Sequence, residues 1–281
     1  MQTGLQSERQ RAQAEALQRA RLAVQGDRPA EAERFAREVL AANAGHLEAT
    51  KLLGYALVMQ DRADEAVAPL EKAARASRDP EAETQLAIAL RHSGDNDKAL
   101  LWLRRAVKRT PPFAAAFHEL GYLLFSLQRH DEAVGVLKQG LAVAPMMPEM
   151  SIQLGFVSSA LGDHAGAAAA FSHALAINPA NPDALHGFGI LSMNSGDYRR
   201  AAELYRRAVS VNADDTVARI MLGNCLLELG DRDAAHALLR AASARGGEFY
   251  GKAIQAMVSS GRGRFWLRPS AAAKFLKGTG A

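Results

Sequence analysis

The segment PDALHGFGILSMNSGDYRRAAELYRRAVSVNADD, residues 182–215, contains the pattern that decides the fold. Its Gly189 is followed after 12 residues by Ala201 and after 16 residues by Tyr205. Small residues at two such positions allow antiparallel helices to approach closely at their crossing, where larger side chains would separate them. The segment therefore predicts two packed antiparallel helices.

The same spacing recurs along most of the chain. The small position of the first helix recurs in steps of 33, 34, 34, 34 and 34 residues, at Gly54, Ala87, Gly121, Gly155, Gly189 and Gly223. The small position of the second helix is Ala66, Ala99, Ala133, Ala167, Ala201 and Ala235. The large residue after it is Leu70, Leu103, Leu137, Phe171, Tyr205 and Leu239. Self-similarity at this period indicates a stack of identical helical units.

The predicted turn inside a unit combines a residue that ends a helix with one that begins the next. It reads Gly94-Asp95, Gly162-Asp163, Gly196-Asp197 and Gly230-Asp231. Glycine is favoured just past a helix C-terminus, and aspartate is favoured as an N-cap. Each unit is therefore predicted to contain a helix, a tight turn, a second helix and a short loop.

These positions resemble the tetratricopeptide repeat family, which has Leu-Gly early in the unit, Ala in the middle and Pro at the end. The Leu-Gly pairs are Leu53-Gly54, Leu120-Gly121, Leu154-Gly155 and Leu222-Gly223, and the terminal prolines are Pro111, Pro145 and Pro179. The resemblance implies an all-α fold, a right-handed superhelical α-solenoid. It also implies that the first helix of each unit lines a concave groove.

The repeat phase divides the chain into six to seven units. They are 13–46, which is degenerate, followed by 47–79, 80–113, 114–147, 148–181, 182–215 and 216–249. Residues 1–12 are an N-terminal extension, 250–260 are predicted to form a C-terminal capping helix, and 261–281 form a basic, partly flexible tail.

Composition narrows the possible functions. Cys225 is the only cysteine, so the sequence offers neither an intrachain disulfide nor a thiolate metal cluster. The histidines lack metal-ligand spacing, and the repeats leave no room for a catalytic domain, so we expect no enzyme activity, no cofactor and no metal. No stretch approaches the roughly 18 apolar residues of a membrane span, and we expect a cytoplasmic protein.

The resemblance places the partner-binding residues on the second, fifth, ninth, twelfth and thirteenth positions of the units, which share one face of the first helix. The predicted groove residues are Lys51, Tyr55, Met59, Ile88, Arg91, His92, His118, Tyr122, Phe125, Ile152, Phe156, His186, Ile190, Asn194 and Asn224. Their apolar and aromatic character favours a hydrophobic or amphipathic peptide segment.

Two other interpretations of this groove compete with peptide binding. Family members that hold acidic chaperone C-termini use a clamp of Lys, Asn and Arg, and here Tyr55, Ala115 and Glu119 occupy positions of that clamp, so we reject it. Ile88, Ile152 and Ile190 can instead pack between neighbouring first helices. Tyr122, Phe125 and Phe156 have large aromatic faces and are predicted to form an anchor cluster.

The tail combines basic and aromatic residues. Residues 248–281 have a formal charge of +5, against −1 for 1–247, and contain Phe265, Trp266, Leu267 and Arg268, residue types that often dominate interfaces. The segment docks on a partner, folds over the last unit, or contacts acidic lipid or nucleic acid. Because the charge of the repeats is nearly balanced, we expect a protein partner rather than a nucleic acid. We therefore expect a non-catalytic scaffold, adaptor or chaperone. The alternative is a basic-tailed accessory protein of a nucleic-acid or secretion assembly, with the repeats as a spacer.

Overall fold

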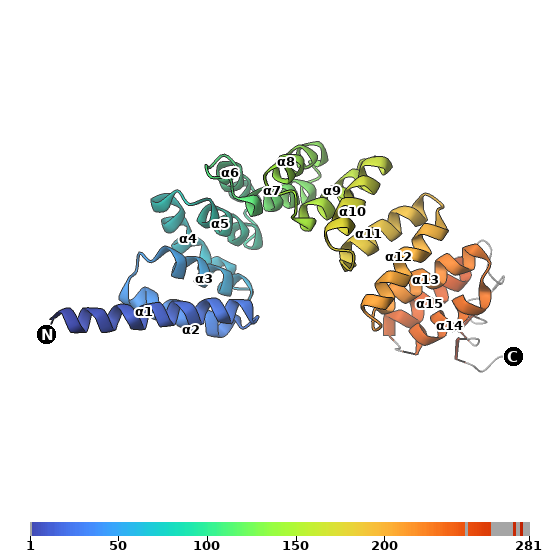
Figure 1. Ribbon diagram of the computed structural model, residues 1–281, viewed down its shortest axis with the longest axis horizontal. Helices are drawn as coiled ribbons and strands as arrows, with labels where there is room; N and C mark the ends of the chain where they lie inside the picture. Colours follow the sequence, from blue (N-terminus) through green and yellow to red (C-terminus); the bar gives the residue numbers. More distant parts are fainter. Residues whose placement is uncertain (1, 245–246, 260–271, 274–275, 278–281) are drawn as a thin grey trace. The chain divides into compact units, whose positions relative to one another are not determined.

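The computed structural model describes residues 2–244, 247–259, 272–273 and 276–277. Within these ranges the named elements are all α-helices, and most follow one another as antiparallel pairs (Figure 1). The all-α prediction is thus confirmed. The chain forms two compact units, Met1–Ala144 and Pro145–Ala281.

The first unit contains four helix pairs. Within it the first helices of successive pairs contact one another, α1 with α3, α3 with α5 and α5 with α7, and each second helix also contacts the first helix of the next pair. The helices are α1 (Gln2–Gln25), α2 (Pro29–Ala42), α3 (Leu47–Val58), α4 (Ala63–Ser77), α5 (Pro80–His92), α6 (Asn96–Ala106), α7 (Ala114–Ser126) and α8 (His130–Val143).

The second unit contains three further pairs and a final helix. The helices are α9 (Pro148–Ala160), α10 (His164–Ile177), α11 (Pro182–Asn194), α12 (Tyr198–Val211), α13 (Thr216–Leu229), α14 (Arg232–Ser243) and α15 (Gly247–Ser259). Helix α15 packs on both α13 and α14, the position that the first helix of another pair would take.

In most helix pairs a large side chain of the second helix packs directly against a glycine of the first helix. A Cβ added to Gly121 would lie 2.6 Å from Cδ2 of Leu137, and one added to Gly189 would lie 2.6 Å from Cζ of Tyr205. Gly54, Gly155 and Gly223 face Leu70, Phe171 and Leu239 in the same way. Ala87 at the equivalent position is fully buried. The packing reason predicted for the recurring glycines is therefore confirmed.

The predicted turns have the expected geometry. Gly94, Gly162, Gly196 and Gly230 have φ angles between +77° and +87°, in the left-handed region that favours glycine at the end of a helix. The aspartates that follow them accept a hydrogen bond from the backbone N–H three residues on, as Asp197 does from Arg200 at 3.1 Å.

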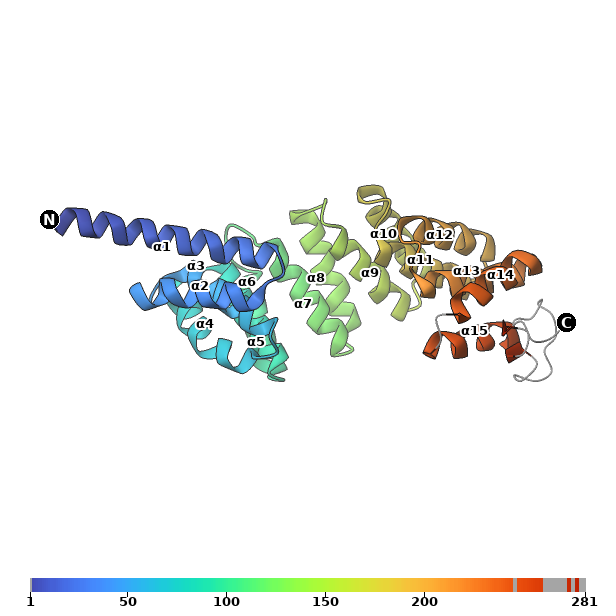
Figure 2. The same cartoon turned by 90° about the horizontal axis from the view of Figure 1, so that it is seen from below.

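The helices at both ends of the chain begin and end at somewhat different residues than the sequence predicted. Residues 2–12 continue helix α1 without a break, and α1, with 24 residues, extends past the 14-residue α2 (Figure 2). At the other end α15 runs to Ser259, close to the predicted capping helix. Ala272 and Leu276 of the tail belong to the hydrophobic core of the second unit, together with Ala253 and Ala256 of α15. These two tail residues therefore pack in the core of the second unit.

The glycine contact gives a stability test with a matched control. Gly121→Ala is expected to destabilise the full chain by about 1–3 kcal/mol, because the added methyl group must displace Leu137. Gly135→Ala in α8 makes the same change at an exposed helical position with no atom within 4 Å, and is expected to stabilise by about 0.5–1 kcal/mol.

Urea unfolding followed by circular dichroism measures both effects. Equal effects of the same sign would show that the close approach of Gly121 and Leu137 does not limit the packing of this pair.

Candidate partner-binding faces

The predicted groove residues lie on the first helices, and we call the row that they form within each unit its first-helix face. In the first unit the face is built by α3, α5 and α7, which contact one another in that order. It presents Lys51, Tyr55, Met59, Ile88, Arg91, His92, His118, Tyr122 and Phe125. None of these side chains is fully buried.

Lys51 is committed to the protein itself. Its Nζ donates hydrogen bonds to Asp79, at 3.1 Å, and to Glu81, both at the start of α5. Partial burial disfavours the charged amine, but the hydrogen bonds from the amine to Glu81 and Asp79 outweigh this effect and raise its pKa above the ordinary value. Lys51 therefore joins neighbouring pairs rather than offering a free cation.

A polar and aromatic cluster occupies the middle of this face. The guanidinium of Arg91 lies 4.9 Å from the ring centre of Tyr122 and 3.7 Å from a carboxylate oxygen of Glu119. Nη2 of Arg91 also lies 3.3 Å from Nε2 of His92. Loss of solvation is the main cause that lowers the pKa of His92, and the charge of Arg91 adds to it. The cluster holds Tyr122 in place while 46% of its surface remains exposed.

The other members of the face differ in exposure. Met59 is 48% exposed, whereas Tyr55 and Ile88 are half-buried. Phe125 is half-buried with its ring centre 5.3 Å from that of His130, and His118 lies 3.6 Å from Glu119. In the sequence Glu119 stands out only as a position where the acidic-peptide clamp fails. In the structure it is the carboxylate that joins the polar cluster.

In the second unit the first-helix face is lined by aromatic and neutral polar residues. Phe156 of α9 is 37% exposed, and its ring stands edge-on to that of Phe171 at 5.2 Å. A Cβ at Gly187 of α11 would lie 2.9 Å from Cζ of Phe156 and 2.6 Å from Phe171. Gly187 therefore makes room for both rings, a role that its place two residues before Gly189 did not reveal.

The remaining residues of this face divide into packed and exposed ones. Ile152 is only 7% exposed and belongs to the hydrophobic core, so its packing interpretation is correct. Ile190 is 38% exposed, Asn194 is exposed, and Asn224 is half-buried. The ring of His186 stands edge-on to that of Tyr205 at 5.8 Å.

The predicted anchor cluster draws on both units. Tyr122 and Phe125 belong to the first unit and Phe156 to the second, so their joint action stays a prediction. The tail residues Phe265, Trp266, Leu267 and Arg268 lie outside the described residues.

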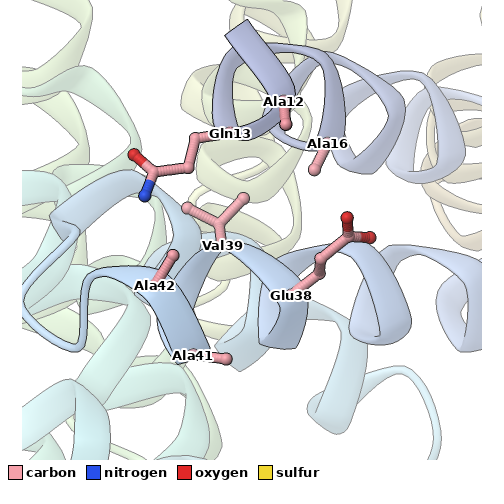
Figure 3. A pocket seen from close by; sticks show the side chains of 7 residues that line it. All are labelled: Ala12, Gln13, Ala16, Glu38, Val39, Ala41 and Ala42. Carbon is pink, nitrogen blue, oxygen red and sulfur yellow. The ribbon is translucent and has the colours of Figure 1, made fainter. Parts of the chain in front are cut away.

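The structure also contains a cavity away from these faces. It has a volume of about 430 Å³ and lies between α1 and α2, where short side chains such as Ala12, Ala16 and Ala42 face one another (Figure 3). Gln13 and Glu38 are its polar lining residues, and we assign it no ligand.

Two properties of the described residues concern other classes of function. In the described ranges no three His, Cys, Asp or Glu side chains gather in a way that could hold a metal ion. No helix in the same part of the chain is long and apolar enough to cross a membrane. The cytoplasmic location stays a prediction.

Comparisons with known proteins identify the repeat. Two family models, both described as tetratricopeptide repeat, match residues 192–258 and residues 17–83 and 118–182. No curated protein sequence matches the chain.

Similar solved structures include PilF of Pseudomonas aeruginosa, with 20% identity and a TM-score of 0.63, covering 73% of this chain and 95% of PilF. PilW, described as a type IV pilus biogenesis factor, gives 20% identity and a TM-score of 0.64, covering 73% of this chain and 96% of PilW. A thermophilic protein of the same repeat from Thermus thermophilus gives 26% identity and a TM-score of 0.53, covering 64% of this chain and 99% of the thermophilic protein.

The polar cluster gives a test by titration. In the native protein the pKa of His92 is expected below its ordinary value near 6.5, because solvation loss and Arg91 disfavour the charged ring. The native state therefore binds this proton less readily than the unfolded chain, so its stability falls as the pH drops through 6.5 toward the lower native pKa. Arg91→Gln is expected to raise the pKa of His92 without restoring it fully, since solvation loss is the larger cause.

Titration of the His92 ring by NMR measures the shift. Arg75→Gln on α4 removes an exposed arginine paired with Glu71 and serves as the control. A His92 pKa that is unchanged by Arg91→Gln would contradict the contact.

Proposed function

The chain belongs to the tetratricopeptide repeat family, and we propose that its first-helix faces bind a hydrophobic or amphipathic segment of a partner protein. Arrays of this family generally act as non-catalytic scaffolds for protein interactions. The proposal goes further because it assigns the binding surface and the chemistry of the bound segment.

Large apolar side chains remain exposed at equivalent positions of several repeats. Four large apolar side chains at the ninth or thirteenth position of their repeats remain more than a third exposed, namely Met59, Tyr122, Phe156 and Ile190. Exposed apolar side chains are common singly on protein surfaces, but a set at equivalent positions of a repeat gives the first-helix face of each unit two apolar contact points. Burial of such side chains on binding would supply the main favourable free energy.

The neighbouring polar groups fit a protein ligand. The amides of Asn194 and Asn224 each offer donors and acceptors that can pair with a peptide backbone. Arg91 already contacts Tyr122 and Glu119, so this cation is partly neutralised. These features support an apolar or amphipathic segment over a strongly acidic one.

The test selects its ligand by affinity for the full chain alone. A displayed library of random peptides is passed over the immobilised protein, and the enriched peptides are measured by fluorescence anisotropy. Tyr122→Ala is expected to weaken binding by about 2 kcal/mol, roughly 30-fold, and Phe156→Ala by a similar amount, since each removes an aromatic contact.

Leu101→Ala is the matched control. Leu101 is 68% exposed but lies on the second helix α6, so its truncation is expected to leave the affinity unchanged. Failure to enrich any peptide, or equal weakening by Leu101→Ala and Tyr122→Ala, would overturn the proposal. Circular dichroism of each variant verifies that the helices are retained.

A further inference from the structure

Helix α12 in the second unit carries four arginines that no carboxylate of the described residues neutralises. Arg199, Arg200, Arg206 and Arg207 are all exposed and make no ion pair with any acidic residue in the described ranges. Glu203 lies between them on the same helix and is likewise without an ion pair there. Four of the five charges on the exposed side of α12 are therefore positive.

In the equivalent helix of the first unit, α6, the corresponding arginines are paired with carboxylates. Arg104 and Arg105 of α6 stand at the repeat positions of Arg206 and Arg207. Arg104 pairs with Glu132 at 2.8 Å, and Arg105 pairs with the buried Glu83 at 2.9 Å.

The two acceptor positions are changed in the second unit. The position of Glu83 is Leu185, and the position of Glu132 is Ala234. Leu185 is as fully buried as Glu83. The arginine pair is thus present in both helices, but the two carboxylates that neutralise it around α6 are replaced around α12 by Leu185 and Ala234.

Two of the α12 arginines are held in place at the rim of an open cavity. Arg200 lies over the ring of Phe188, 4.2 Å from its centre. Nη2 of Arg207 donates a hydrogen bond of 2.7 Å to the carbonyl oxygen of Pro179. Stacking uses the face of a guanidinium and leaves its N–H edges able to donate, and a single hydrogen bond leaves most of the donors of Arg207 unused. Both groups are oriented without being neutralised.

The cavity between α10, α11 and α12 has an apolar floor. Its volume is about 380 Å³. Phe188, Leu175 and Leu204, all less than 10% exposed, line it with Ala176, while Arg200, Glu203, Arg207 and Ser172 also border it. Such a site suits an apolar side chain flanked by carboxylates.

We propose that this arginine-rimmed cavity of the second unit binds an acidic segment of a partner protein, with one apolar side chain of the segment in the cavity and its carboxylates on Arg200 and Arg207. Glu203 can accept a hydrogen bond from a backbone N–H of the segment. A nucleic acid fits less well, because Glu203 interrupts the row of cations and the apolar floor offers nothing to a phosphate. The site lies on the second helices α10 and α12 and on Phe188 of α11, and it includes none of the residues of the first-helix faces.

The experiment uses the full chain and a fluorescein-labelled peptide built from four Glu-Leu-Glu triplets, measured by anisotropy. Arg200→Gln combined with Arg207→Gln is expected to weaken binding about tenfold or more, since charge-assisted hydrogen bonds are lost. Lys72→Gln combined with Lys138→Gln makes the same charge change at exposed positions of α4 and α8, and is expected to change the affinity less than about twofold.

Glu203→Gln is expected to increase the affinity for the acidic peptide, an effect that loss of folding would not produce. It removes the one negative charge of the rim, so the acidic peptide is expected to bind about threefold more tightly. The affinity for the acidic peptide is also expected to fall as salt is raised, because exposed charges are screened.

Three results would overturn the proposal. The first is an equal effect of the arginine and lysine variants, which indicates unspecific attraction. The second is failure of the acidic peptide to bind, or binding of a peptide with Gln in place of Glu that is as tight as that of the acidic peptide or tighter. The third is tighter binding of a labelled oligothymidine that is lost in the arginine variant, which would assign the surface to nucleic acid.

Discussion

The contact between a glycine of one helix and a large side chain of its partner determines how closely the pairs pack. Tyr205 and Phe171 are among the largest fully buried side chains, and each lies where a glycine Cβ would otherwise stand. Because the helix axes can approach only where that Cβ is absent, the position fixes the register of the two helices. The register in turn sets which residues of the first helix face the next pair and which stay exposed.

This constraint explains why so much of the fold could be predicted from the sequence. A residue that tolerates no side chain recurs visibly, as Gly121, Gly155 and Gly189 do, and so do the turn glycines with left-handed backbone such as Gly196. The pairing of helices and the positions of the caps follow from these local rules. The division of the chain at Ala144 does not, because it depends on how well neighbouring pairs pack on each other.

The candidate site was predicted less completely, for a physical reason. Repeat phase indicates which residues share a face, but not how neighbouring side chains use their charges. Lys51 and Arg91 were both expected to be available, and the structure shows each of them engaged with carboxylates of neighbouring helices. Ile152 shares its repeat position with His118, but the first is buried and the second partly exposed. Such differences arise from pairwise contacts across helices that no single repeat encodes.

The arginines of α6 and α12 show that one repeat position can have two electrostatic roles. Whether an arginine there is structural or available is decided by residues on other helices, Glu83 and Glu132 in one case and Leu185 and Ala234 in the other. A repeat array can therefore gain a charged surface without changing the helix that carries it. Counts of charge along a segment, which are balanced for most of this chain, do not detect such a change, since the counts do not depend on which charges meet.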